Sequence, residues 1–593
     1  METNHLKASV LKERKSGMIK KLAASIRQYK RDSILAPVFV TMEVVMEVVI
    51  PVLMANLIDF GIEEGNMGYI LKIGAALILS TVISLLFGAL SGRAAAKASA
   101  GYAANLRKDM YYNVQDFSFS NIDKFSAASI VTRLTTDVTN VQNAYQMIIR
   151  TAVRGPMMLV FSLAMAFGIN PELSLIFLGA IPVLGVGLFL VATKAHPIFE
   201  RMFKTYDKLN TVVQENLRGI RVVKSFVRED YEKDKFSAVS ESIRRDSSRA
   251  EKILAFNSPL MQFSMYACIL LISWFGAKLI VGSEMSTGQL MSLISYASQI
   301  LMSLMMLSMI FVMVTMSRAS MERIVEILKE RADITDGAQD CREVRDGSIR
   351  FEQVEFRYKK EGKACLSEIN LDIKSGQTVG ILGGTGSGKS SLVQLIPRLY
   401  DVSKGAVLVG GVDVRDYNLE ALREEVAMVL QKNVLFSGTI KDNLRWGNET
   451  ASDEELERVC RLAQADSFIR EFPQGYDTYI EQGGTNVSGG QKQRLCIARA
   501  LLKKPKVLIL DDSTSAVDTK TDSLIRQAFR EEIPDTTKLI IAQRVASVQD
   551  ADQIVVLDGG RIADVGTHEE LMKRSGIYRE VYESQVKGED ENA

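Results

Sequence analysis

The alternation of apolar and polar positions divides this chain of 593 residues near its middle. In the first half, several apolar stretches are long enough to form helices that cross the roughly 30 Å hydrocarbon core of a bilayer. They cover residues 33–58, 73–90, 152–169, 173–193, 260–280 and 290–314. In the second half, short apolar runs alternate with amphipathic segments, as in α/β domains. The pattern predicts an all-α transmembrane domain of six helices followed by an α/β domain.

The distribution of charge sets the expected domain boundaries. We place the transmembrane domain at 1–325, a charged linker at 326–347, the α/β domain at 348–587 and an acidic tail at 588–593. Two connections between spans, 91–151 and 194–259, are long, charged and helical in pattern. Each contains a turn that predicts a helix–helix corner, near 122–135 in the first and near 211–226 in the second.

Lysine and arginine are frequent in both long connections and near the N-terminus, which predicts that these segments and the α/β domain face the cytoplasm. The net charge of +1 gives no global basic surface for nucleic acid. A soluble ATPase acting on nucleic acid is also incompatible with six spans. The five cysteines are scattered without metal-ligand spacing, as expected for reduced thiols. We therefore expect a multi-pass protein of the cell inner (plasma) membrane, embedded in the lipid bilayer.

A phosphate loop lies in the α/β half, where G-G-T-G-S-G-K-S matches the pattern G-x-x-x-x-G-K-[ST]. The preceding apolar run 378–382 predicts the buried strand that this pattern requires. Glycine N–H groups would surround a polyphosphate, Lys389 would contact its β- and γ-phosphates, and Ser390 would bind Mg²⁺. A glycine-rich turn that only ends a strand would leave the Lys-Ser pair unexplained. The predicted loop comprises Gly383, Gly384, Thr385, Gly386, Ser387, Gly388, Lys389 and Ser390, followed by Ser391.

A second motif makes the resemblance to a known family specific. The segment V-S-G-G-Q-K-Q-R at 487–494 resembles the signature motif of ATP-binding cassette (ABC) proteins. One predicted helix separates it from the apolar run 507–510, and further runs at 427–430, 539–541 and 554–557 predict a mostly parallel sheet. With six spans ahead of one such P-loop nucleotide-binding domain, the whole chain resembles an ABC exporter half-transporter. The resemblance implies that the two helix–helix corners are coupling helices.

The resemblance also implies roles for individual residues. Tyr358 is expected to stack on adenine, and the alternative is a strand aromatic packed in the core. Gln431 is expected to sense Mg²⁺ and to contact the membrane domain, whereas Asp511, at the end of a buried strand, is expected to hold Mg²⁺. A last group is expected to close on the γ-phosphate of ATP bound to the opposite cassette: Ser488, Gly489, Gly490 and Gln491.

Two catalytic positions depart from the family pattern. Asp512 stands where the family usually has the glutamate that polarises water, and Gln543 stands where it usually has a histidine. Gln482 and Val517 replace a usual glutamate and leucine nearby. One interpretation is drift in a slow ATPase. We favour the other, a subunit with a degenerate ATP site that pairs with a different chain, because two losses stand beside an intact phosphate loop and signature. In this the chain resembles the degenerate half of heterodimeric bacterial multidrug exporters.

The function implied by the resemblance is ATP-driven export of small, amphipathic or drug-like molecules together with a second half-transporter. A heterodimer is the favoured assembly and a homodimer is the alternative. A membrane domain fused ahead of its cassette favours export over import. The alternative functions are a lipid or peptide flippase on the same scaffold and an ATP-gated channel or regulatory subunit.

Two groups of membrane residues are candidates for substrate contacts. Glu43 and Glu47 share one face of the first span, and one of them is expected to contact cationic substrates. A structural pair of carboxyl groups is the equally weighted alternative. Methionines, which adapt to varied apolar ligands, form a stripe along the last span, although plain helix packing also explains it. The stripe consists of Met302, Met306, Met309, Met313 and Met316.

Overall fold

The computed structural model describes residues 17–337, 339–359, 361–512 and 517–590, which contacts divide into two units. One unit comprises the described residues up to Gln115 together with Ser126–Glu330. The other comprises Asp116–Phe125 together with the chain from Arg331 onward. The first unit is helical, and the second contains every β-strand in the described part of the chain.

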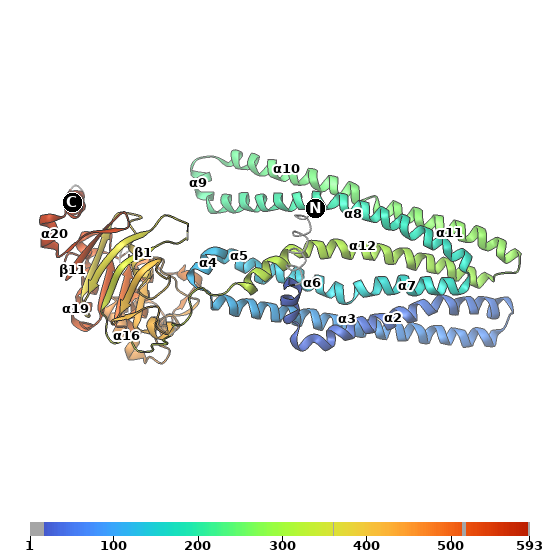
Figure 1. Cartoon of the computed structure of the whole chain (residues 1–593), viewed down its shortest axis with the longest axis horizontal. Coiled ribbons are helices and arrows are strands. Elements are labelled where there is room, and N and C mark those ends of the chain that lie inside the picture. The colour runs from blue at the N-terminus through green and yellow to red at the C-terminus, as the bar shows by residue number, and fades with distance from the viewer. Residues whose placement is uncertain (1–16, 338, 360, 513–516, 591–593) are drawn as a thin grey trace. The chain divides into compact units, whose positions relative to one another are not determined.

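Several helices of the first unit, α3 and α8 among them, are much longer than a bilayer requires (Figure 1). Six helical segments of the described chain are long and apolar enough to cross a membrane, which confirms the predicted spans. At 1.5 Å per residue, the 49 residues of α3 extend over about 74 Å. The charged connections are therefore largely continuations of the spanning helices. The long helices are α2 (Lys30–Leu57), α3 (Met67–Gln115), α6 (Val138–Ile149), α7 (Thr151–Ile169), α8 (Pro171–Arg218), α10 (Glu229–Leu254), α11 (Asn257–Val281) and α12 (Thr287–Lys329).

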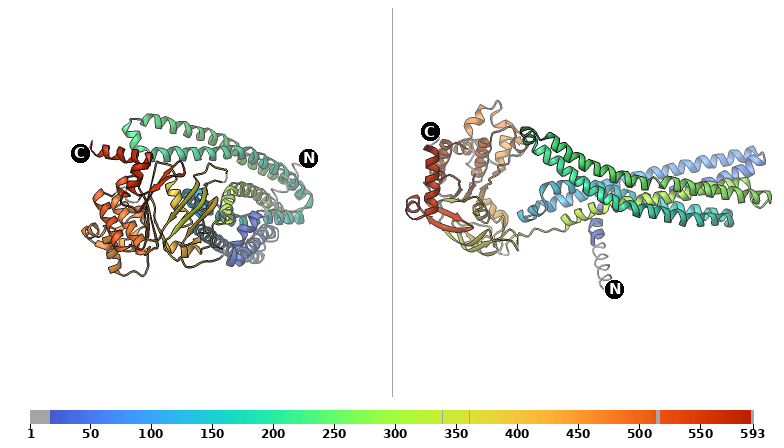
Figure 2. Two further views of the ribbon diagram at one scale, coloured as in Figure 1. Left: turned by 60° about the vertical axis from the view of Figure 1, so that its left-hand side comes forward. Right: turned by 90° about the horizontal axis from the view of Figure 1, so that it is seen from above.

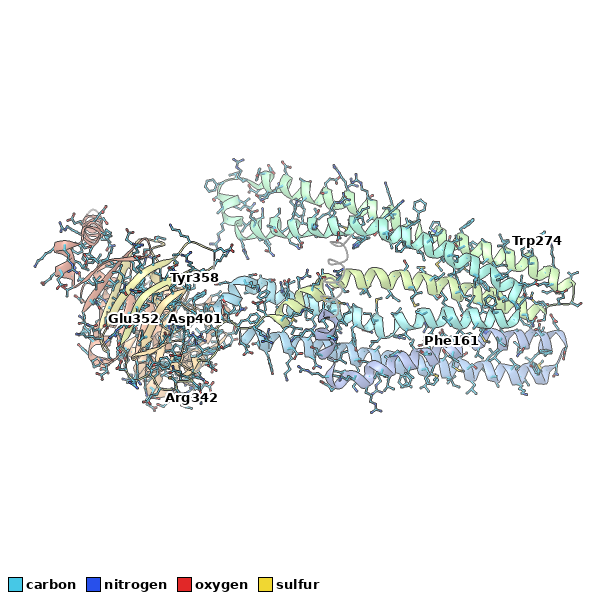
Figure 3. The ribbon with its side chains drawn as sticks, viewed as in Figure 1. Phe161, Trp274, Arg342, Glu352, Tyr358 and Asp401 are labelled. Atoms are coloured by element: carbon cyan, nitrogen blue, oxygen red, sulfur yellow. The ribbon has the colours of Figure 1, made fainter. Side chains whose placement is uncertain are left out.

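Small residues allow these helices to approach closely. Ala36 of α2 packs with Ala94, Ala95 and Ala98 of α3 in one buried cluster. α2 and α3 lie side by side, as do α8 and α10 (Figures 1 and 2). Trp274 of α11 instead points away from the bundle and is 65% exposed, as suits a lipid-facing side chain (Figure 3). Shorter elements of this unit are α5 (Ala127–Thr132), α9 (Ile220–Ser225) and the π-helical segments η2 (Ile58–Glu63) and η3 (Arg133–Asp137).

The second unit is built on two main sheets. A four-stranded antiparallel sheet has the order β2-β1-β4-β5, and a six-stranded sheet has the order β12-β11-β3-β10-β9-β6 with only β12 antiparallel. The mostly parallel sheet predicted from the apolar runs is confirmed, and all five of those runs fall within or against its strands. The strands are β1 (Ile349–Phe356), β2 (Leu366–Ile373), β3 (Thr378–Gly383), β4 (Lys404–Val409), β5 (Val412–Asp413), β6 (Val426–Val429), β7 (Gly438–Thr439), β8 (Tyr479–Ile480), β9 (Val507–Asp511), β10 (Thr537–Ile541), β11 (Gln553–Asp558) and β12 (Arg561–Gly566).

Both faces of the six-stranded sheet are buried. Ile509 and Ile541 contribute to a core shared with the antiparallel sheet, whereas Leu508, Leu510 and Ile540 contribute to a core shared with helices. This double burial explains why the strands read as continuous apolar runs. The helices of this unit are α4 (Phe119–Phe125), α13 (Lys389–Gln394), α14 (Leu419–Glu425), α15 (Ile440–Arg445), α16 (Asp453–Leu462), α17 (Asp466–Glu471), α18 (Gly489–Leu502), α19 (Thr519–Glu532), α20 (His568–Arg574) and α21 (Gly576–Asp590).

Three segments refine the expected boundaries. α12 continues to Lys329, so the segment assigned to the linker, 326–347, begins within a helix. α21 continues to Asp590 and thus enters the segment assigned to the acidic tail, of which 591–593 lie outside the described residues. α4, which overlaps the first predicted corner, groups with the cassette unit, where the Tyr400 hydroxyl donates to Asp123 at 2.8 Å.

Candidate ATP site

The parallel strands bring the predicted catalytic residues to one edge of the sheet. In the register of β9, β10 and β3, Asp511, Ile541 and Ile381 stand at the same level. β6 runs beside β9, with Val429 opposite Leu510. The segments that follow these four strands therefore emerge side by side at their carboxyl ends, where ligands of open parallel sheets bind. They carry Gln431, Asp512, Gln543 and the phosphate loop.

The phosphate loop has the backbone of an anion cradle. Gly386 and Gly388 adopt φ of +80° and +96°, values that favour glycine. No other atom lies within 4 Å of the place where a Cβ would stand on Gly384 or Gly386, so their backbone is open to a ligand. The Ser387 hydroxyl is buried in the loop and has no hydrogen-bond partner among the described residues. An incoming phosphate oxygen would satisfy it.

Lys389 opens helix α13 with its ammonium held over the loop. Nζ donates to the carbonyl oxygens of Gly383 and Gly384, each at 2.9 Å. Burial lowers the pKa of Lys389, and the negative charges of Asp512 and Asp511 oppose that shift. A partly buried ammonium that donates to two carbonyl oxygens has a third N–H that can donate to a phosphate oxygen.

Ser390 and Asp511 form a pair of oxygen donors. The Ser390 hydroxyl donates to Oδ1 of Asp511 at 2.9 Å. Burial raises the pKa of Asp511, while the hydrogen bond from Ser390 lowers it. No cluster of three or more acidic, histidine or cysteine side chains that could hold a metal occurs within the described residues. A hydroxyl and one carboxylate fit Mg²⁺, which takes few protein ligands and completes its shell with phosphate oxygens and water.

Asp512 and Gln543 are bonded to each other. Nε2 of Gln543 donates to Oδ2 of Asp512 at 2.8 Å, and the Asp512 N–H donates to the carbonyl of Ile541 at 3.1 Å. Asp512 is 9% exposed and has φ of +49°, a left-handed conformation that aspartate tolerates better than most residues. The two departures from the family pattern therefore act as one hydrogen-bonded unit.

Tyr358 follows strand β1 and is half exposed (Figure 3). Its hydroxyl is 2.9 Å from the Ser391 hydroxyl, next to the predicted Mg²⁺ ligand Ser390. Its ring packs edge-on against Phe356 and Tyr400, with centroids 4.7 and 5.2 Å away. Burial raises the pKa of the Tyr358 hydroxyl. An aromatic ring that is anchored at both ends and partly exposed can receive a base on its free surface.

The signature segment starts helix α18. The Ser488 hydroxyl accepts from the Gln491 N–H at 3.3 Å, and the Gln491 side chain accepts from the Ser488 N–H at 2.9 Å. This capping box fixes the helix start. Ser488 and Gly489 are exposed, and Gly490 is partly exposed. The positive end of a 14-residue helix is thus presented at the surface, where it can meet an anion.

In the membrane unit, Arg154 of α7 joins the two predicted acidic residues of α2. Arg154 donates to Glu43, and its Nη2 also donates to the two carboxylate oxygens of Glu47 at 2.7 and 2.8 Å. Beside Arg154, a cavity of about 180 Å³ lies between α7 and α12. Met302 and Met306 line it, whereas Met309 is 63% exposed and Met313 is partly buried. The side chain of Met316 is outside the described part.

Sequence reasoning missed two partners of these residues. Arg154 is a positively charged residue within an apolar segment. Its charge, opposite to those of Glu43 and Glu47, could have indicated from the sequence that the three residues pair. Gln585 of α21 accepts from the Val545 N–H and donates to the Gln543 carbonyl, both at 2.8 Å, which fixes the segment after β10. Nothing in the local sequence identifies this contact between segments 40 residues apart.

Comparisons with known proteins agree with this geometry. Residues 33–304 match the family described as ABC transporter transmembrane region, and residues 366–515 match the family described as ABC transporter. The ABC transporter ATP-binding protein YfiB of Bacillus subtilis (strain 168) is 36% identical over 567 residues, covering 96% of this chain and 98% of YfiB. The corresponding protein MT1311 of Mycobacterium tuberculosis (strain CDC 1551 / Oshkosh) is 33% identical over 569 residues, covering 95% and 97%.

A solved structure has the same fold. The structure of a bacterial Atm1-family ABC exporter with ATP bound matches with a TM-score of 0.82 at 23% identity. The match covers 94% of this chain and 99% of that one. At this identity the likeness concerns the fold.

Proposed function

Because the chain belongs to the ABC transporter family, we propose that it is an exporter half-transporter, which exports small amphipathic molecules as one half of a heterodimer. Its cassette binds ATP, and transport in this family is coupled to ATP hydrolysis. We further propose that the pair resides in the cell inner (plasma) membrane with its cassettes in the cytoplasm. The basic residues of the long connections support this orientation.

The observation that carries the proposal of a degenerate site is the bond between Gln543 and Asp512. The amide hydrogen bond occupies one oxygen of the Asp512 carboxylate, and aspartate is one methylene shorter than glutamate. Misplacing a catalytic group by about 1 Å can cost on the order of 10²-fold in rate. Glutamine also cannot become cationic as histidine can. ATP therefore binds here and is hydrolysed slowly.

The remaining residues have distinct roles in ATP binding. Tyr358 stacks on the base, and the loop 383–391 holds the phosphates with Lys389. Ser390, Asp511 and Gln431 would hold Mg²⁺, which would supply positive charge to the bound nucleotide. The exposed Ser488–Gln491 start of α18 completes the ATP site of the partner subunit, because two cassettes arranged head to tail exchange their signatures.

We propose that the substrate contacts the cavity beside Arg154. Its walls are mostly apolar and include the thioethers of Met302 and Met306, which can adapt to ligands of different shapes. The two carboxylates against one guanidinium leave an excess negative charge on this part of the helix bundle. That excess favours a cationic amphipathic substrate over an anionic one.

The test is transport by the purified pair, made of this chain and the half-transporter that copurifies with it. Reconstituted into vesicles with outward-facing cassettes, the pair should accumulate ethidium against its gradient only with hydrolysable ATP. The matched control is the pair in which Lys389 and the equivalent lysine of the partner are replaced by alanine. Dissipation of an imposed ethidium gradient would instead favour the channel function. Movement of fluorescent phospholipid without ethidium accumulation would favour the flippase.

A further inference from the structure

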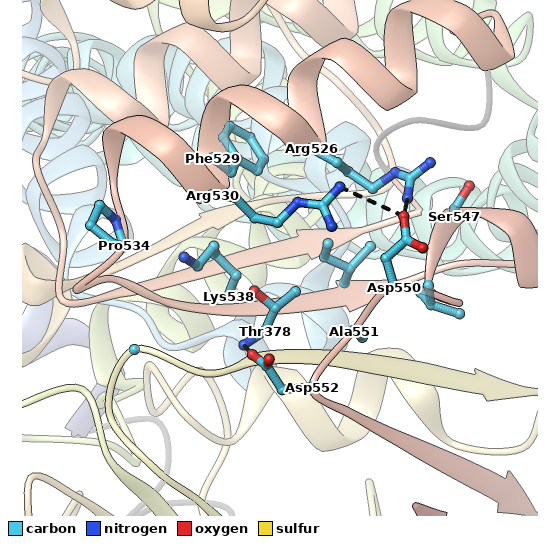
Figure 4. A pocket seen from close by; sticks show the side chains of 13 residues that line it. Thr378, Arg526, Phe529, Arg530, Pro534, Lys538, Ser547, Asp550, Ala551 and Asp552 are labelled. Atoms are coloured by element: carbon cyan, nitrogen blue, oxygen red, sulfur yellow. Dashed lines mark hydrogen bonds and ion pairs between the residues drawn. The ribbon is translucent and has the colours of Figure 1, made fainter. Parts of the chain in front are cut away.

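A cavity of about 210 Å³ lies at the amino ends of strands of the six-stranded sheet, whereas the phosphate loop lies at their carboxyl ends. Figure 4 shows the side chains that line the cavity. It is lined by the starts of β3 and β10, by the second half of α19, and by the segment 547–552. The phosphate loop follows the other end of β3. Since a strand rises about 3.3 Å per residue, the five steps from Thr378 to Gly383 separate the two places by about 17 Å. The cavity is therefore distinct from the ATP site.

Lys538 is the unusual residue of this cavity. It is only 2% exposed, although lysine is almost never fully buried unless it is paired. Its ammonium donates to the carbonyl of Ile533 at 3.0 Å and makes no ion pair with any described residue. An ammonium has three donors, and burying it without a counter-ion is unfavourable. A buried cation that faces a cavity and has no ion-pair partner among the described residues, with only the more distant charges of Asp552 and Asp535 acting on it, marks a candidate binding site.

The other charged groups around the cavity are already engaged. Arg526 contacts Asp550 at 3.1 Å and Asp522 at 3.3 Å, and the same Asp550 oxygen lies 3.6 Å from Arg530. Asp552 accepts from the Thr378 N–H at 2.8 Å. Arg530 is half exposed, so its guanidinium can turn toward a ligand at the mouth of the cavity (Figure 4). The titratable and charged groups facing Lys538 are Asp522, Arg526, Arg530, Asp535, Asp550 and Asp552.

Apolar side chains form much of the remaining wall. Phe529, Ile540 and Val548 are each less than 5% exposed in the chain and present hydrocarbon to the cavity. Such a surface is best covered by an apolar ligand body. Asp550 and Asp552 at the rim would repel a second negative charge on the ligand.

We propose that this cavity binds a compact organic monocarboxylate. Its carboxylate pairs with Lys538 and Arg530, and its apolar body lies against Phe529, Ile540 and Val548. The site is independent of the proposed transport function. It lies between α19 and the segment that follows Gln543, so a ligand there contacts two elements that border the ATP site.

Ligand binding at this cavity should also depend on pH through the protonation of Lys538. Burial lowers the pKa of Lys538, and the charges of Asp552 and Asp535 partly offset that shift. A bound carboxylate favours the protonated ammonium, so binding takes up protons whenever the free amine is partly neutral. Affinity should then fall as the pH rises through the pKa of Lys538 in the free protein, because the neutral amine has no charge to pair.

The experiment uses the full chain in lipid nanodiscs, saturated with MgADP so that the ATP site is filled. Calorimetry with benzoate as the probe should show binding, with neutral benzyl alcohol and dianionic phthalate binding at least tenfold more weakly. Lys538→Met should weaken benzoate binding at least tenfold, and Arg530→Gln should weaken it several-fold. The matched control is Lys520→Met, which removes an exposed lysine from α19, the helix that carries Arg530. ADP affinity reports whether each variant is folded.

The outcomes separate the proposal from a structural role of Lys538. Benzoate affinity that is equal in the Lys538→Met and Lys520→Met proteins would overturn it, as would the absence of benzoate binding to the unmodified chain. Should Lys538→Met fail to bind ADP, the Arg530→Gln protein decides, since Arg530 is half exposed and its loss leaves the core intact. Unchanged affinity in that variant would then contradict the site.

Discussion

At the scale of single residues, the ATP site combines an intact phosphate-binding half with an altered catalytic half. Lys389, Ser390 and Asp511 contact one another or the loop as expected of a Mg²⁺-nucleotide site. Asp512 and Gln543 bond to each other, so one oxygen of the Asp512 carboxylate accepts from an amide. Such a site keeps affinity for ATP because binding and hydrolysis depend on different atoms.

Restoring both altered residues should restore hydrolysis. We expect the double change Asp512→Glu and Gln543→His to raise turnover at this site by about tenfold or more, since correct placement of a general base contributes about 10²–10⁴-fold. The measurement is ATPase activity of the pair with the partner's own catalytic glutamate replaced by glutamine, so that only this site turns over. The single change Gln543→His is the control. No gain in the double variant would place the defect elsewhere, such as in the partner's signature.

Local sequence was sufficient for some of this site and not for the rest. The phosphate loop could be predicted because its strand, turn and helix are consecutive in the chain. The Ser488–Gln491 capping box is likewise a local pattern. The bond between Asp512 and Gln543 depends on β9 and β10 being neighbours in register, which no local pattern specifies. Gln585 reaches the same segment from the last helix for packing reasons alone.

At the scale of elements, one ion cluster links two membrane helices. Arg154 of α7 bonds to Glu43 and Glu47 of α2, and the three side chains are between 10% and 26% exposed. Glu43 also packs against Gly88 of α3, where a Cβ would lie 3.0 Å from its carboxylate. Charges in an apolar layer persist when each has a partner, so this cluster fixes how α2 and α7 meet.

Removing the cation alone should be more harmful than removing all three charges. Arg154→Met leaves the buried Glu43 and the partly exposed Glu47 without a counter-ion, and breaking a buried ion pair in this way costs about 3–5 kcal/mol. Its thermal unfolding in detergent should therefore begin well below that of the unmodified chain. The triple variant Arg154→Met, Glu43→Gln, Glu47→Gln should recover most of the loss. Equal stability of the single and triple variants would contradict the ion cluster.

The substrate role of the same carboxylates calls for a separate measurement. Glu47 is 26% exposed and keeps a surface that a cationic ligand can reach. We expect Glu47→Gln to lower ethidium transport several-fold while a neutral dye is transported as before, because only the cation loses an electrostatic partner. Gln299→Leu, on the wall of the neighbouring cavity, is the uncharged control. An unchanged ratio of the two rates would leave the carboxylates with a structural role only.

The elements themselves differed in how well their patterns predict them. The strands of the six-stranded sheet read as apolar runs because both faces are buried. The strands β1 and β2 alternate buried and exposed residues over eight positions and were not identified individually. The long polar connections proved to be extensions of the spanning helices, since hydropathy marks where a helix enters lipid and not where it ends.

At the scale of the whole molecule, a half-transporter supplies parts to two ATP sites. Its phosphate loop, Asp511, Asp512 and Gln543 belong to one site, and its signature at Ser488 belongs to the other when cassettes pair head to tail. The exposed capping box of Ser488 and the hydrogen-bonded Asp512 therefore affect different ATP sites of the pair. Under the proposed asymmetry, the departures at Asp512 and Gln543 affect only the site that this chain's phosphate loop builds.

This asymmetry predicts unequal effects of two substitutions in the same chain. In the proposed heterodimer, Ser488→Ala removes a donor to ATP at the site where the partner would supply glutamate and histidine, and should lower ATPase activity of the pair by about 10²-fold or more. Asp512→Asn alters the site that we propose to be slow and should lower the total less than twofold. Because Ser488→Ala also removes a helix cap worth about 1 kcal/mol, the control is Ser452→Ala, which removes the capping box of α16. Steady-state ATPase activity of the purified pair, with one subunit changed at a time, measures all three. Equal losses from Asp512→Asn and from replacement of the partner's catalytic glutamate would show two equivalent sites, and the heterodimeric assignment would then be wrong.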